Sequence, residues 1–236
     1  MCFQATLYFN PSEIPGIEGD IYDGAEAVEE LIHVTAFAQP TLPIITNETP
    51  NNVSAARWGL VPSWVKDAVQ AHDLSLMTLN ARSEEVWSKP SYRAAIRKTR
   101  GLFPVSGFIE WHHDKKLKIP HLVRVPGPRV FTLACIWDEW LDKESGEVLR
   151  TFSVMTTQAN ELMSYIHNSK KRMPVIIQPE NRRAWLTSED RAEVETLMQP
   201  LADGILEAWP ISSEVSRVRV ETEHPEVLEP IGDVIR

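Results

Sequence analysis

The fold class is decided by three apolar stretches: LKIPHLVRV at residues 117–125, RVFTLACIW at residues 129–137 and VLRTFSVMTT at residues 148–157. β-Branched and aromatic residues are frequent in each of them, which is typical of strands. Pro126-Gly127-Pro128 separates the first pair, and residues 142–146 separate the second. The pattern predicts three successive antiparallel strands, each turning directly into the next.

Outward from this centre, strands remain more frequent than helices. We expect short helices at residues 25–34, 90–99, 158–165, 179–185 and 189–198. Because helices do not alternate with strands, the sequence predicts an α+β fold with antiparallel sheet. We expect one domain over residues 1–211, a loop at 10–24, and a wrapping or loose acidic tail over residues 212–236. Further strands are expected at residues 3–9, 53–60, 102–111, 173–177 and 205–211, with residues 37–46 extended.

Composition excludes several classes of protein. The sequence has no run of about 18 apolar residues that would indicate a membrane span, and its first residues do not resemble a signal peptide. We therefore expect it in the cytoplasm, associated with the nucleoid if the protein is bacterial. We also expect a monomer. The two cysteines form no framework of bridges, and neither a CxxC nor an HExxH motif is present, so no metal or cofactor is expected. The net charge of −9 argues against a broad DNA-binding surface but leaves room for a local basic groove.

Met1-Cys2 carries the most distinctive chemistry in the sequence. Removal of Met1 would give Cys2 an α-amine of pKa about 7.7–8.0 beside a thiol of pKa about 8.5. Such a pair can condense with an aldehyde, because the amine forms an imine and the thiol then closes a thiazolidine ring. The alternative is that Cys2 begins the first strand and packs inward, as free cysteines often do.

Other polar residues lie at the ends of apolar segments. Asn80 and Arg82 share one face of an extended segment, and Glu110 sits late in an apolar strand, where an unpaired buried carboxyl group acquires a raised pKa. His167 follows a short helix and precedes the cationic run Lys170-Lys171-Arg172. The candidate acid/base groups are therefore Glu110 and His167, although a strand-end glutamate and a solvated basic turn are the commoner explanations.

Five motifs occur in an order that resembles the SRAP (SOS response-associated peptidase) family. They are Met1-Cys2, Trp58-Gly59-Leu60-Val61-Pro62-Ser63-Trp64, Asn80-Ala81-Arg82-Ser83-Glu84, Ser106-Gly107-Phe108-Ile109-Glu110-Trp111, and Ile166-His167-Asn168 with Arg172-Met173-Pro174-Val175-Ile176. The resemblance extends from Cys2 to about Ile211. It implies antiparallel strands in a pseudo-barrel or bifurcated sheet with peripheral short helices.

The resemblance also implies a function in the DNA damage response. Such proteins sense abasic sites in single-stranded DNA and form a covalent thiazolidine crosslink through the terminal cysteine, with lyase and crosslink-reversal activities. By motif, Cys2 would be the nucleophile, Asn80 would orient amine and sugar, Glu110 would shuttle protons, and His167 would assist Schiff-base formation and reversal. The implied DNA contacts are Arg82, Trp58 and Pro40.

Two departures from the family pattern concern DNA binding. The family usually begins Cys-Gly-Arg, whereas this chain has Phe3 and Gln4, so a cation is missing at Gln4. The family often runs from His-Asn directly into Arg-Met-Pro, whereas Ser169-Lys170-Lys171 is inserted here. We expect Lys170 and Lys171 to replace the lost cation, and Arg172 to contact DNA beside them.

Two other functions compete with this one. A cysteine peptidase or amidase could use Cys2, His167 and Asn80 as nucleophile, base and orienting group, although only Met1 precedes Cys2 for self-processing. A non-enzymatic DNA or protein adaptor would simply bury Cys2. Only a site that assembles these distant residues would favour the covalent chemistry.

Overall fold

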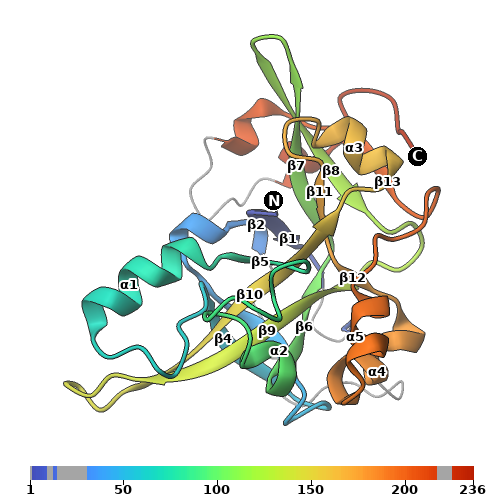
Figure 1. Cartoon of the computed structure of the whole chain (residues 1–236). Coiled ribbons are helices and arrows are strands. Elements are labelled where there is room, and N and C mark those ends of the chain that lie inside the picture. The colour runs from blue at the N-terminus through green and yellow to red at the C-terminus, as the bar shows by residue number, and fades with distance from the viewer. Residues whose placement is uncertain (1, 10–12, 15–30, 217–224) are drawn as a thin grey trace.

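Two β-sheets form the framework of the protein (Figure 1). The computed structural model describes residues 2–9, 13–14, 31–216 and 225–236. The helices are α1 (Ala68–Met77), α2 (Ala95–Lys98), α3 (Glu161–Ile166), α4 (Arg182–Thr187) and α5 (Arg191–Leu197). The strands are β1 (Gln4–Leu7), β2 (Leu31–Thr35), β3 (Thr41–Thr46), β4 (Val53–Trp58), β5 (Asn80–Arg82), β6 (Arg100–Val105), β7 (Gly107–Asp114), β8 (Leu117–Arg124), β9 (Phe131–Leu141), β10 (Val148–Gln158), β11 (Arg172–Pro174), β12 (Ile176–Ile177) and β13 (Glu207–Pro210).

Five strands close into a barrel. Their pairings run β10–β4–β3–β6–β9 and return to β10, so no member of this ring has a free edge within it. All of these pairings are antiparallel except β10–β4, which is parallel. The short strands β5, β11 and β12 attach to β10 and β9 outside the ring. Closure matters because an unpaired strand edge exposes backbone donors and acceptors.

Three aromatic rings contact one another in the core of the barrel. The ring of Trp58 lies 5.6 Å from that of Phe103 and 5.8 Å from that of Phe152, and all three side chains are fully buried. The indole nitrogen of Trp58 donates a hydrogen bond of 2.8 Å to the carbonyl oxygen of Leu79, so its polar atom is satisfied. Gly59 follows with a φ of 120°, a conformation that side chains rarely adopt, which explains the Trp-Gly pair.

The second sheet holds five strands in the order β13-β8-β7-β1-β2. The chain passes between barrel and second sheet at Ser106, whose backbone nitrogen donates to Thr6 O, and again at residues 126–128. The expected hairpin across residues 126–128 is therefore wrong, because β8 pairs with β7 and β13 while β9 pairs within the barrel. The expected hairpin across residues 142–146 is confirmed, since β9 pairs with β10.

Two helix expectations also need correction. Leu31–Thr35 is strand β2, paired antiparallel with β1, whereas residues 25–30 lie outside the described part of the chain. The adjacent side chains Ile32, His33 and Val34 are all buried, so the segment has no polar face of the kind that a surface helix shows. Of residues 90–99, only Ala95–Lys98 is α-helical. Most of the expected loop at residues 10–24 also lies outside the described residues.

Arg100 fixes the helices α2 and α4 against the barrel. Its buried guanidinium group donates to the carbonyl oxygens of Ile96, Trp185 and Ser188, at or near the ends of these helices. Carbonyl groups at helix ends lack partners within the helix, so a cation there satisfies them and complements the helix dipole. The α+β class and its mainly antiparallel sheet are confirmed, and none of the helices in the described ranges could cross a membrane.

We predict that Trp58→Ala lowers the free energy of unfolding by about 3–5 kcal/mol, because it leaves a cavity inside the closed barrel. Trp64→Ala is the matched control, because the Trp64 side chain is 49% exposed and its loss should cost less than about 1 kcal/mol. Urea unfolding of both variants measures the difference. Equal losses would mean that the barrel core does not carry the stability assigned to it.

Candidate functional site

A cavity of about 500 Å³ lies between the start of the chain, the β7–β8 hairpin and the loop that follows α3. Phe3 and Gln4 line it from β1 and the residue before it, and Glu110 lines it from β7. His167, at the C-terminal end of α3, lines it from the other side. Segments more than 50 residues apart in the chain therefore meet here.

Cys2 packs beside this cavity. β1 pairs antiparallel with β7 through Ala5 opposite Phe108 and Thr6 opposite Gly107, which carries the chain start along β7 toward Glu110. The Cys2 side chain is completely buried, and its thiol contacts Gln4 O at 3.8 Å. Burial raises the pKa of the thiol, and the carboxylate of Glu110 raises it further. The buried thiol is therefore protonated at neutral pH.

Glu110 is the buried acid of the site. Its position on β7 gives it only 4% exposure, and this burial raises its pKa from 4.5 to about 7. A carboxyl group with that pKa is part protonated and part ionised near neutral pH. It can therefore both donate and accept a proton, which is the property required of a general acid/base.

His167 lies close to Glu110, with 3.8 Å between Nδ1 and a carboxylate oxygen. Burial is the main reason that its pKa falls from 6.5 to about 4, so the ring is neutral at pH 7. Nδ1 lies 3.0 Å from the carbonyl oxygen of Arg172. Because a carbonyl oxygen only accepts, Nδ1 carries the proton and Nε2 keeps a lone pair, which leaves Nε2 able to act as a base.

Residues on both sides of His167 in the sequence contact β7 and so hold His167 in place. The ring of Tyr165 in α3 stacks on His112 of β7 at 4.5 Å, which ties the helix to the hairpin. Asn168 donates to His113 O and accepts from His113 N, so the residue after His167 is fixed to the same strand. The adjacent residues His112 and His113 of β7 thus fix the segments on both sides of His167.

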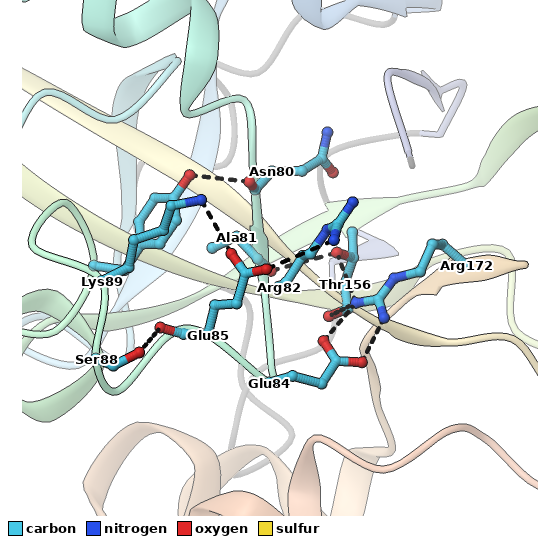
Figure 2. A network of polar contacts seen from close by, with 10 residues as sticks. Asn80, Ala81, Arg82, Glu84, Glu85, Ser88, Lys89, Thr156 and Arg172 are labelled. Atoms are coloured by element: carbon cyan, nitrogen blue, oxygen red, sulfur yellow. Dashed lines mark hydrogen bonds and ion pairs between the residues drawn. The ribbon is translucent and has the colours of Figure 1, made fainter. Parts of the chain in front are cut away.

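Arg172 holds the far end of this loop (Figure 2). Its guanidinium group forms a two-pronged ion pair with Glu84, with 2.9 Å on one prong, and donates to Thr156 O. The side chain is largely buried, so its charge is already neutralised inside the protein. Arg172 therefore orients the backbone carbonyl that fixes His167, and direct contact with DNA would first require it to leave Glu84.

Asn80 and Arg82 project from the same side of β5, as their spacing predicts (Figure 2). Asn80 is buried, and among the described residues neither its amide oxygen nor its amide nitrogen has a hydrogen-bond partner. A buried amide without partners costs free energy unless a ligand satisfies it. No direct hydrogen bond joins Asn80 to Glu110 or His167 in the described part of the chain.

A second cavity, also of about 500 Å³, adjoins the first one through Lys170, which lines both. Arg82 and Lys171 line it as well, and all three cations are exposed. Arg82 has one ion pair, with Glu85 at 3.6 Å, and its side chain is half-exposed. This is a local basic surface on a chain of net charge −9.

Two of the expected DNA contacts, Trp58 and Pro40, lie in or next to the strands of the barrel. Trp58 lies inside the barrel with no exposed surface, so its ring cannot contact a nucleic acid in this structure. Pro40 is half-buried, and its carbonyl oxygen accepts from the backbone nitrogen of Trp58. Trp58 is therefore excluded as a DNA contact in this structure, whereas a DNA contact of the partly exposed Pro40 stays a prediction.

Sequence reasoning missed the remaining walls of the first cavity. Phe37, His113 and Lys118 line it, yet none stood out in the sequence. The polar run His112-His113-Asp114-Lys115-Lys116 could have indicated an exposed hairpin. In the structure Lys115 lies at its tip with a positive φ. Phe37 carried no such signal.

Comparison with known proteins identifies similar chains. The family model described as SOS response associated peptidase (SRAP) matches residues 1–218. The abasic site processing protein YoqW of Bacillus subtilis is 34% identical over 197 residues, covering 82% of this chain and 84% of that protein. The abasic site processing protein HMCES of Gallus gallus is 34% identical over 200 residues, covering 74% of this chain and 56% of that longer protein.

Two solved structures are similar to this chain in fold. A crystal structure of a protein from Bacteroides thetaiotaomicron superimposes with a TM-score of 0.90 at 35% identity, covering 97% of this chain and 99% of that one. A protein from Bordetella bronchiseptica has a TM-score of 0.75 at 18% identity, covering 89% and 100%, which shows the fold alone.

The raised pKa of Glu110 predicts a pH-dependent stability. Between about pH 4.5 and 7 the folded protein holds a proton that the unfolded chain has lost, so this contribution is present below pH 4.5 and disappears as pH rises through 7. The free energy of unfolding of Glu110→Gln, relative to that of wild type, should therefore rise by about 3 kcal/mol between pH 4.5 and 8. Urea unfolding across this range measures it.

His167→Gln is the control, because its effect has the opposite sign. The pKa of His167 is lowered, so wild type should gain stability over this variant as pH rises from about 4 to 6.5. A pH-independent difference between wild type and Glu110→Gln would contradict the buried acid.

Proposed function

This chain belongs to the SRAP family, and from that premise we propose that it processes abasic sites in single-stranded DNA through a covalent bond to Cys2. The observation that carries the proposal is that Glu110 and His167, from distant parts of the chain, line one cavity, while Cys2 lies close enough to Glu110 for its carboxylate to raise the pKa of the thiol. The relatives YoqW and HMCES are named abasic site processing proteins, which supports abasic DNA as the substrate.

The reaction begins with the amine. Once Met1 is removed, the free amine of Cys2 attacks the aldehyde carbon of the ring-opened sugar, and the carbinolamine loses water to give an imine. The thiol then adds to the imine carbon, its proton passes to the nitrogen, and a thiazolidine results. One water leaves in total.

Each buried group has a place in these steps. Glu110, with a pKa of about 7, takes the proton from the attacking amine and gives one to the departing hydroxyl group. Asn80 supplies an amide donor and acceptor for the opened sugar, which would satisfy its buried amide. Nε2 of neutral His167 relays the thiol proton to the ring nitrogen, and as a base toward C2′ of the imine it would support strand cleavage by β-elimination.

The electrostatics favour this chemistry over peptide hydrolysis. A cysteine peptidase needs a thiolate beside a protonated histidine. Here the pKa of Cys2 is raised, by burial and by Glu110, while the pKa of His167 is lowered to about 4. Both shifts oppose the ion pair. A mechanism in which the amine attacks first, and the thiol only adds to an existing imine, does not need it.

The basic cavity next to the site is the proposed phosphate-binding surface. Arg82, Lys170 and Lys171 surround it, and Lys170 also borders the cavity that holds Glu110. An abasic sugar in the first cavity would thus place an adjacent phosphate near cations. An abasic nucleotide has no base to unstack, so it enters such a pocket at small cost.

Cys2→Ala should abolish a heat-stable adduct with an abasic oligonucleotide, because without the thiol the labile imine cannot close to a thiazolidine. Denaturing gels and intact mass measure this, and the wild-type adduct should weigh the processed protein plus the oligonucleotide minus one water. Cys135→Ala is the matched control, since Cys135 is equally buried but lies in β9 of the barrel. An adduct formed by Cys2→Ala, or by wild type on an oligonucleotide without the lesion, would refute the assignment.

Replacing Lys170 and Lys171 by Gln should weaken non-covalent binding to single-stranded DNA and make it less dependent on salt. Each lost phosphate contact lowers the slope of log K against log salt by about 0.7. Titrations by fluorescence polarisation at several salt concentrations give that slope. Lys143→Gln is the control: Lys143 lies in the β9–β10 turn and lines neither of the two cavities, so its loss should leave the slope unchanged. An unaltered slope in the double variant would remove the proposed phosphate surface.

A further inference from the structure

The cavity beside Glu110 has an aromatic wall that the covalent chemistry does not use. Phe3 and Phe37 form it, with ring centroids 4.8 Å apart and an angle of 35° between the rings. Phe3 is half-buried, whereas Phe37 is 61% exposed. A large apolar ring that faces an open cavity gains free energy when another flat apolar group covers it.

The exposed ring of Phe37 is held on a fixed backbone. Phe37 is the middle residue of a 3-10 helix over Ala36–Ala38, and Ala36 N donates to Phe3 O at 2.8 Å. On the other side, Gln39 adopts a positive φ, and its side chain donates to Ser75 of α1 at 2.7 Å. The ring is therefore presented to the cavity by a segment anchored at both ends, which reduces the entropy lost on binding.

Two lysines and a histidine also line this cavity. Lys118 and His113 face each other across the β7–β8 hairpin, and Lys170 comes from the loop after His167. All three residues are exposed. Asn168 ties this loop to the hairpin through its two hydrogen bonds with His113. One cavity thus contains an aromatic surface, cationic side chains, and the acid/base pair.

This combination matches the chemistry of a nucleotide that has a base. An abasic sugar carries no flat group and would leave the aromatic wall uncovered, whereas a base has a π-face that stacks on aromatic rings with little sequence preference. Its phosphate would be attracted by the lysines. The total volume of about 500 Å³ leaves room for more than a sugar.

We propose that the cavity binds an intact nucleotide next to the lesion, with its base stacked on Phe37 backed by Phe3 and its phosphate toward Lys118 and Lys170. This inference rests on the proposed function and adds a requirement to it, because one neighbour of the abasic site must carry a base. The Phe3–Phe37 pair then provides contact where the chain lacks a cation at Gln4, whose side chain instead hydrogen-bonds to His33 at 2.6 Å.

The test is a binding cycle between protein and DNA. Wild type and Phe37→Ala are titrated with single-stranded oligonucleotides that contain tetrahydrofuran, an abasic analogue that cannot open to an aldehyde. One oligonucleotide has bases on both sides of the analogue, one lacks the 5′ neighbouring base, and one lacks the 3′ neighbouring base. Phe37→Trp preserves an aromatic face. Leu117→Ala is the matched control, because it removes an exposed apolar side chain near the tip of the β7–β8 hairpin.

Phe37→Ala should weaken binding about tenfold when both neighbouring bases are present, as expected for loss of one stacked base. That loss should disappear on one of the two oligonucleotides that lack a neighbour, which identifies the side of the lesion. Phe37→Trp should bind like wild type, and Leu117→Ala should show no loss. The same tenfold loss on all three oligonucleotides, or no loss on any, overturns the nucleotide site.

A second measurement separates this inference from the proposed function. On a natural abasic oligonucleotide, Phe37→Ala should need about tenfold more DNA than wild type to reach half of its maximal adduct rate, because the ring binds the neighbouring nucleotide, whereas Leu117→Ala should not. A half-saturating DNA concentration that is the same for Phe37→Ala and wild type overturns that role. A wild-type protein that forms no adduct refutes the covalent function alone, since the binding cycle uses DNA that cannot react.

Discussion

The antiparallel pairing of β1 with β7 is the constraint on which the site depends. It places Ala5 opposite Phe108 and Thr6 opposite Gly107, and so directs the chain start along β7 toward Glu110. Gly107 suits this close approach, because a Cβ atom there would lie 2.7 Å from a methyl group of Leu122 and 3.1 Å from the hydroxyl oxygen of Thr6. A side chain at this position would have to displace the end of the Leu122 side chain and press against Thr6 of β1 and the backbone of Val123 in β8.

Burial then sets the protonation states of the site. The same desolvation that raises the pKa of Glu110 to about 7 lowers the pKa of His167 to about 4, so near neutral pH the available proton resides on the carboxyl group and the imidazole is a neutral base. This is the reverse of the order in water. The site accordingly offers a proton donor and a proton acceptor at one pH, which imine chemistry at an aldehyde requires.

The basic surface is small and lies where two cavities meet. Arg172 looked like part of it in the sequence, but its pairing with Glu84 turns it into a support for the His167 loop. Lys170 and Lys171 remain exposed beside Arg82. Local placement of a few cations thus reconciles a net charge of −9 with a proposed anionic partner, since affinity depends on the phosphates contacted and not on the total charge.

The sequence by itself determined the strand-rich α+β class, the β9–β10 hairpin, and the residue types Cys2, Glu110 and His167, because local composition, short turns and unusual polar positions are visible in a single chain. It failed for residues 31–34 and for the turn at 126–128, where the strand partners are distant and a local pattern cannot specify them. Tertiary structure alone decided that Trp58 is interior, that Arg172 is neutralised, and that Phe37 faces the cavity. The physical reason is that burial and charge pairing are properties of neighbours in space, which the closed barrel and the second sheet bring together only after folding.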